Sequence, residues 1–181
     1  MTLEERIEKL EERIEKLEAR LKGNFVANSI ITRKIVLFDK KNKSRISLSV
    51  TNNAPELVMK DESGQRRLIL GFTENEPILA MSDKNGLPRI SLGTLQEGPV
   101  LGMIGENGQP RIMLRVQGNE TTLLLGDKNA KSRVLLSAPQ EGPLLGMSDK
   151  NGQARVSMRA QQDMPMLFML DENGELIWSA P

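Results

Sequence analysis

The feature that most constrains this chain is an internal repeat of 22 residues that runs from Asp39 to the C-terminus. Seven segments follow one another at this spacing without insertion or deletion: DKKNKSRI, DESGQRRL, DKNGLPRI, GENGQPRI, DKNAKSRV, DKNGQARV and DENGELIW. An unbroken internal repeat predicts a structure built by stacking one unit. We therefore divide the chain into a first segment at 1–23, a connector with one strand at 24–38, and six full repeats and one truncated repeat at 39–181.

Each repeat holds two short runs in which apolar residues alternate with other residues. Ile46, Leu48 and Val50 share one face of the first run, and Leu57 and Met59 share one face of the second. Such alternation predicts β-strands with one buried side. With the run RKIVLF before the first repeat, the chain should supply about fourteen strands in one antiparallel meander.

The turn at 83–86, with the sequence DKNG, presents two alternatives. A two-residue type I′ turn at Asn85 and Gly86 places Met81 opposite Ile90, so that the apolar residues share one face. A three-residue loop with a bulge would place Met81 opposite Arg89 and would divide the apolar residues between both faces. We therefore predict the type I′ turn. A calcium loop would need more oxygen ligands and a bidentate Glu, so we predict no metal site here.

A second turn should precede a position that is usually proline. Thr121 occupies this position in the fourth repeat, and the other repeats have Pro55, Pro77, Pro99, Pro143 and Pro165. This turn would pair Leu92 with Leu101 and Ile90 with Met103, which keeps the same register throughout the meander.

The first segment predicts an α-helical coiled coil with the spacing 4, 3, 4, 3, 4 at Leu3, Ile7, Leu10, Ile14, Leu17 and Leu21. Gly23 should end the helix. Isoleucine at a and leucine at d favour a dimer. The repeated RIEKLE, however, resembles the R-h-x-x-h-E pattern of short three-stranded coiled coils, so we favour a trimer. The residues expected to hold the trimer are Arg6, Ile7, Leu10, Glu11, Arg13, Ile14, Leu17 and Glu18.

A sheet of fourteen strands would be about 65 Å long, and its apolar face must find a cover. We therefore predict a mainly β protein with an N-terminal coiled coil, in which three chains pack their hairpin repeats as a triangular β-prism or fibre. The RIEKLE pair and the unbroken hairpin repeats resemble trimeric fibrous proteins, such as phage tail-fibre shafts and trimeric adhesin stalks. The resemblance is to a class, and no functional residue carries over from it.

Composition narrows the possible functions. The chain has no Cys, His or Tyr, and its 25 basic and 24 acidic residues nearly balance. The absence of these side chains disfavours most hydrolase and transition-metal chemistry, and the charge balance disfavours nucleic acid or a membrane as partner. We predict a non-enzymatic structural shaft or spacer without a cofactor, whose partner is itself. The alternative is a trimeric protein that binds carbohydrate or a cell surface. With no signal peptide or membrane span visible, a cytoplasmic, virion-associated or leader-trimmed protein is expected.

One candidate binding surface is a column of arginines at Arg45, Arg67, Arg89, Arg111, Arg133 and Arg155. The column could grip a polyanion such as an acidic glycan or a surface polymer. Alternatively, each arginine could pair with a turn Asp or a loop Glu, which we favour. Only Gly105, Thr121 and the apolar C-terminal tip interrupt the repeat. Trp178 takes a position that is aliphatic in the other repeats, where it could close the end of the core.

Overall fold

The computed structural model describes residues 2–21, 29–161 and 164–181. The chain divides into two units, Met1–Thr32 and Arg33–Pro181, and each is considered by itself. The prediction that Gly23 ends the helix concerns a residue outside the described ranges.

The first unit contains the helix α1, Leu3–Leu21. Thr2 and Glu5 form a capping box at its start, in which the Thr2 amide donates to Glu5 Oε2 at 2.8 Å and the Glu5 amide donates to Thr2 Oγ1 at 3.3 Å. The apolar stripe is solvent-exposed, with exposed fractions of 48% for Ile7 and 53% for Ile14. The helix is therefore amphipathic but lacks a partner for its apolar side within the described part of the chain.

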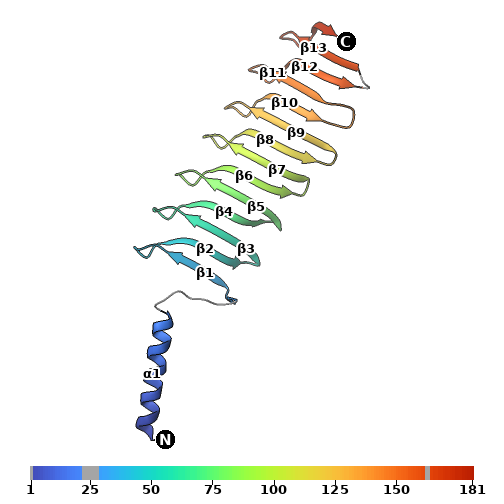
Figure 1. The fold of residues 1–181 in the computed structure, drawn as a ribbon. Coiled ribbons are helices and arrows are strands. Elements are labelled where there is room, and N and C mark those ends of the chain that lie inside the picture. Colours follow the sequence, from blue (N-terminus) through green and yellow to red (C-terminus); the bar gives the residue numbers. More distant parts are fainter. Residues whose placement is uncertain (1, 22–28, 162–163) are drawn as a thin grey trace. The chain divides into compact units, whose positions relative to one another are not determined.

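The second unit is one antiparallel sheet of 14 strands in sequence order, so that each strand pairs only with its neighbours along the chain (Figure 1). The predicted meander is confirmed. The strands are β1 Lys34–Phe38, β2 Ser44–Thr51, β3 Ala54–Lys60, β4 Arg66–Thr73, β5 Glu76–Ser82, β6 Pro88–Leu95, β7 Gly98–Ile104, β8 Pro110–Gln117, β9 Glu120–Gly126, β10 Ser132–Ala138, β11 Leu144–Ser148, β12 Ala154–Gln161, β13 Met164–Leu170 and β14 Leu176–Ala180.

The predicted register is also confirmed. Met81 pairs with Ile90 across the first turn, and Ile90 pairs with Met103 across the second. Leu92 pairs with Leu101 in the same way. Strand pairing thus follows the apolar pattern, because a slip of one residue would move every apolar side chain of a strand to the other face.

The predicted type I′ turn at Asn85 and Gly86 is wrong. Of these two residues only Gly86 has a positive φ, at 80°, and a type I′ turn requires both. The Asp83 amide instead donates to the Leu87 carbonyl at 2.9 Å, which closes a three-residue loop. The register nevertheless holds because the ladder shifts between Met81 and Ser82, where Arg89 is an extra residue that restores the alignment.

Turns with two positive φ angles occur at the opposite ends of the strands, ahead of the proline positions. Asn52 and Asn53 have φ of 50° and 64°, and Glu74 and Asn75 have φ of 52° and 71°. We call the turns that begin at Asp39, Asp61, Asp83, Gly105, Asp127, Asp149 and Asp171 the Asp row. The turns that precede Pro55, Pro77, Pro99, Thr121, Pro143 and Pro165 form the Pro row.

Two unbroken apolar rows cross one face of the sheet from strand to strand. The leucine row is Ile35, Leu48, Leu57, Leu70, Leu79, Leu92, Leu101, Leu114, Leu123, Leu136, Leu145, Met158 and Leu167. The mixed row is Leu37, Ile46, Met59, Leu68, Met81, Ile90, Met103, Ile112, Leu125, Val134, Met147, Val156, Met169 and Trp178.

These rows are open to solvent in the single chain. Leu70 and Leu92 are 49% and 48% exposed, and among the described residues Val58 is the only buried large hydrophobic side chain. Val58 lies on the opposite face, next to Ser47 and Ile69 in the ladder. The sheet therefore presents its apolar face without covering it, and one chain supplies hardly any core.

Candidate functional site

The Asp row repeats one hydrogen-bond pattern. In the turn at Asp83, the side-chain Oδ1 accepts from the amides of Asn85 at 2.8 Å and Leu87 at 3.1 Å. The same two bonds, to the second and fourth residues after the aspartate, recur at Asp39, Asp61, Asp127, Asp149 and Asp171. One carboxylate oxygen therefore satisfies two loop amides in each of these turns, which fixes a loop that has no ladder bonds of its own.

The same contacts hold the carboxyls in the ionised form. Burial acts to raise the pKa of Asp83, but bonds from Asn85, Arg89 and Leu87 outweigh it and leave the pKa below its usual value. The pKa is likewise lowered for the aspartates at 39, 61, 127, 149 and 171. The carboxylates are thus fully charged acceptors at neutral pH and are not proton donors.

Five of the six column arginines pair with the aspartate of their own turn, six residues earlier. Arg45, Arg67 and Arg89 reach the Oδ2 of Asp39, Asp61 and Asp83 at 3.6, 3.8 and 2.5 Å. The remaining pairs are Arg133 with Asp127 and Arg155 with Asp149. Each aspartate therefore uses one oxygen for the loop and the other for a guanidinium, so these five positions carry little net charge.

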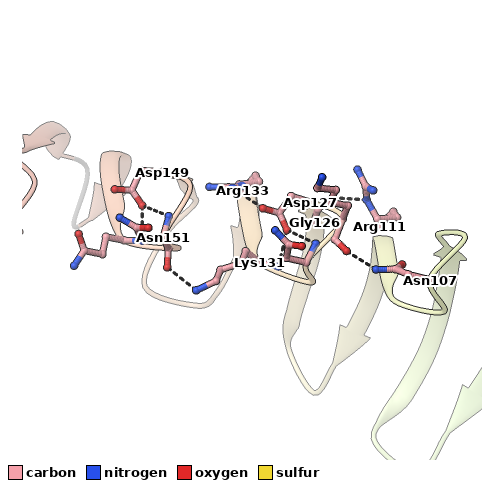
Figure 2. A network of polar contacts seen from close by, with 11 residues as sticks. Asn107, Arg111, Gly126, Asp127, Lys131, Arg133, Asp149 and Asn151 are labelled. Carbon is pink, nitrogen blue, oxygen red and sulfur yellow. Dashed lines mark hydrogen bonds and ion pairs between the residues drawn. The ribbon is translucent and has the colours of Figure 1, made fainter.

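Arg111 is the exception, because Gly105 stands where the other turns have an aspartate. Its Nε donates instead to the Gly126 carbonyl at 2.8 Å, on the neighbouring strand (Figure 2). Its Cγ lies 3.0 Å from the point that a β-carbon at Gly105 would occupy, so the arginine stem lies against the glycine. Asn107 takes over part of the cap by accepting from the Gln109 amide at 3.2 Å.

Side chains also join successive turns of the Asp row. Lys43 Nζ donates to the Glu62 carbonyl at 3.0 Å, and Lys131 Nζ donates to the Asn151 carbonyl at 2.9 Å. Asn107, which is labelled in Figure 2, donates its Nδ2 hydrogen bond to the Lys128 carbonyl of the next turn. The repeat pattern alone does not indicate these links, although the lysine at the fifth position of the turns at 39 and 127 is a visible signal.

The strands carry three further arginines that fall outside the predicted column. Arg66 pairs with Glu56, and the Arg159 guanidinium lies 4.7 Å from the centre of the Phe168 ring. Arg115 on β8 is exposed and has neither contact. Arg115 and Arg159 share one position of the repeat, but the other repeats have Ser or Gly there, and Arg66 has no arginine counterpart, so the repeat shows no column of arginines at these positions.

The residues predicted to form the trimer contacts lie on exposed positions of α1. Arg6, Leu10, Glu11 and Arg13 are solvent-exposed on α1, as are Ile7, Ile14 and Glu18. The side chain of Leu17 lies outside the described residues, although the helix passes through its position. The trimer contacts assigned to this helix remain a prediction.

The C-terminal tip continues the pattern of the sheet. Trp178 pairs with Met169 and ends the mixed row, as its place in the repeat predicted, and it is 48% exposed. Met164 is also exposed, and by the alternation of β13 it shares the opposite face with Phe168, whose ring lies beneath Arg159. Trp178 therefore adds apolar surface to the end of the open face.

Across residues 2–21, 29–161 and 164–181, no group of three or more acidic, Cys or His side chains lies close enough to hold a metal ion. The only helix in these ranges is not long and apolar enough to cross a lipid bilayer. No protein-family model matches the chain, and no curated protein is similar to it in sequence.

Proposed function

We propose that the protein is a non-enzymatic structural shaft or spacer that works as a homotrimer. The observation that supports this is the pair of apolar rows, which run uninterrupted across the sheet and in which every member is exposed or half-buried in the single chain. Burying each such leucine is worth about 1.5–3 kcal/mol, so the open face strongly favours a cover. The described part of the chain supplies no second layer for it.

Another copy of the chain is the cover that fits the rows best. Both rows advance by whole 22-residue repeats, so their length and spacing match those of an identical sheet. The exposed stripe of α1 calls for the same kind of partner, because a helix of three heptads is marginal alone in water. The RIEKLE pair favours three copies over two. Three sheets would then face inward around one axis, with the coiled coil setting their number.

A structural role is favoured because the recurring residues already have a mechanical use. The aspartates and five of the column arginines serve the turns, and the apolar residues serve the rows. An enzyme or a receptor would need side chains released from these tasks and gathered in one place.

Sedimentation equilibrium of the full chain tests the proposal. We expect three times the chain mass of 20.2 kDa. Leu92→Lys should destroy the assembly, because it places a charge in the leucine row. Ser91→Lys is the matched control. Ser91 is the neighbour of Leu92 in the sequence, but it lies on the other face of the sheet, opposite Gly102, so the mass should stay unchanged. A folded wild-type single chain at high dilution would refute the proposal, and twice the chain mass would refute the trimer.

A further inference from the structure

The two arginines of β8 differ from the other strand arginines in having neither a carboxylate nor an aromatic ring as partner. In the described residues, Arg111 and Arg115 have no Asp or Glu within ion-pair distance, whereas every other column arginine has one. Arg66 has Glu56, and Arg159 has the Phe168 ring. A guanidinium never loses its charge in a protein, so β8 holds two uncompensated positive charges.

The acidic side chain nearest to Arg115 in the ladder is engaged elsewhere. Arg115 pairs with Thr122 on β9, two residues from Glu120. Glu120 Oε1 accepts from Ser137 Oγ at 2.5 Å and from Thr122 Oγ1 at 3.4 Å, so the carboxylate is turned toward β10. Arg115 itself is exposed. Its guanidinium is therefore available to a ligand.

Arg111 is half-buried, and its Nε bond to Gly126 fixes the side chain while leaving the terminal amino groups without a carboxylate. In the five equivalent turns an aspartate carboxylate occupies this role. The fourth repeat thus retains the arginine and lacks the aspartate that pairs with it in the other repeats. A carboxylate from outside would restore the pairing with a partner of the same chemistry.

We propose that β8 is a binding site for an acidic polysaccharide that carries carboxylates, with Arg111 and Arg115 as its two contacts. The two arginines are four residues apart on one strand, which corresponds to about 13 Å and to the same side of the sheet. One small anion cannot bridge that distance, whereas successive uronate units of a chain can. Side chains alternate between the two faces along β8, and Leu114, next to Arg115, belongs to the leucine row. Arg111 and Arg115 therefore lie on the face opposite to that row. The site thus does not depend on the trimer.

Fluorescence anisotropy with labelled hexagalacturonate tests the proposal on the full chain. Replacing both arginines, Arg111→Gln with Arg115→Gln, should weaken binding at least about ten-fold, since each charged hydrogen bond is worth roughly that factor. The matched control is Arg89→Gln with Arg133→Gln, which removes two paired arginines and should change the affinity less than about two-fold. Equal losses in both double variants would overturn the proposal, as would the absence of wild-type binding at millimolar probe.

Gly105→Asp supplies a second variant that keeps both arginines. It restores the aspartate found in the other turns, and Gly105 does not have a positive φ that would oppose a side chain. The new β-carbon would lie 3.0 Å from Arg111 Cγ, so the flexible arginine stem must move aside slightly to accept it. The new carboxylate should pair with Arg111 and weaken hexagalacturonate binding by about five-fold or more while the melting temperature holds or rises. Unchanged binding in a folded Gly105→Asp protein would overturn the role of Arg111.

A linear hexaphosphate probe of similar charge checks the ligand class. Binding of both probes should fall as salt is raised, because exposed charges are screened. Stronger binding of hexaphosphate than of hexagalacturonate at equal salt would overturn the assignment to carboxylates. Sedimentation of the same samples separates this test from that of the trimer, since a single-chain mass with intact binding would refute only the proposed function.

Discussion

The two rows of turns connect the same strands, yet they are built by different means. Each turn of the Asp row has one positive φ at the same place, at Asn42, Gly64, Gly86, Gly108, Ala130, Gly152 and Gly174. In six of the seven turns, an aspartate caps the loop. The Pro row has no such common geometry. Side-chain caps therefore impose uniformity, whereas turns made by the backbone alone can differ from repeat to repeat.

The variety of the Pro row shows in its positive φ angles. They occur at both Asn52 and Asn53, at Gly98 with 133°, and at Gly118 with 56°. What these turns share is a position within one residue of the start of the strand that follows, which is proline in five repeats and Thr121 in the fourth. A strand that begins near the same position in every repeat keeps the register even when the turn before it changes.

The largest effect should come from Gly98→Ala in the Pro row. A methyl group there would overlap the Val116 carbonyl oxygen, and φ is 133°. We expect a loss of about 3 kcal/mol in unfolding free energy, measured by chemical denaturation. Gly108→Ala in the Asp row is the control, because φ is 77° but nothing lies within 4 Å of the added carbon. Similar losses in both variants would show that φ alone matters.

Acid should weaken the Asp row as a whole. The six lowered pKa values mean that the unfolded chain takes up protons at a higher pH than the folded chain does. Stability should thus be complete at neutral pH and should fall as the pH drops through the ordinary aspartate value of 3.8 and below it. Because six carboxyls act together, the fall in melting temperature should exceed that of any single Asp-row variant. A melting temperature that stays constant between about pH 6 and pH 3 would contradict this.

Single substitutions at Asp83 separate the cap from the ion pair. Asp83→Ala removes the acceptor for the Asn85 and Leu87 amides and should lower the melting temperature by about 3–6 °C. Asp83→Asn retains an acceptor oxygen and loses only the charge opposite Arg89, so its effect should be smaller. If the two variants melt alike, the ion pair rather than the cap holds the turn.

The smallest effect concerns Ala130, which has a φ of 62° where five of the other turns have glycine. Ala130→Gly should stabilise the protein by about 0.5–1 kcal/mol, since an L side chain is strained in this region. Asn42→Gly, at the same place with a φ of 57°, should gain less because asparagine tolerates the left-handed conformation. Denaturant midpoints would measure both. A loss of stability in Ala130→Gly would mean that chain entropy outweighs strain.

The strand count and the register could be predicted because the apolar alternation determines them at every strand. The turn type could not. Met81 lies opposite Ile90 both with a two-residue turn and with a three-residue loop followed by an extra residue at Arg89. The apolar pattern cannot distinguish these two arrangements, since they differ in the loop backbone and its hydrogen bonds and not in which apolar residues face each other. The aspartate at the first position was the signal for the capped loop.

Part of the candidate site was also within reach of the sequence. The pairing of column arginines with turn aspartates was the favoured alternative, and it holds for five of the six. The lone position of Arg111 followed from Gly105 in the fourth repeat. Arg115 could not be found in this way, because its lack of a partner depends on the direction in which Glu120 points. Only side-chain coordinates show that direction.

Because each strand touches only the strands before and after it, the sheet behaves as a linear chain of coupled units. An interior hairpin has a hydrogen-bonded neighbour on each side, whereas a terminal hairpin has only one. Unfolding should therefore begin at the ends of the sheet and proceed inward. Inserting one more 22-residue unit would raise the total stability by a constant increment and lengthen the sheet by two strand spacings. Length is thus an adjustable property of this design, set simply by how many copies of the unit a gene encodes.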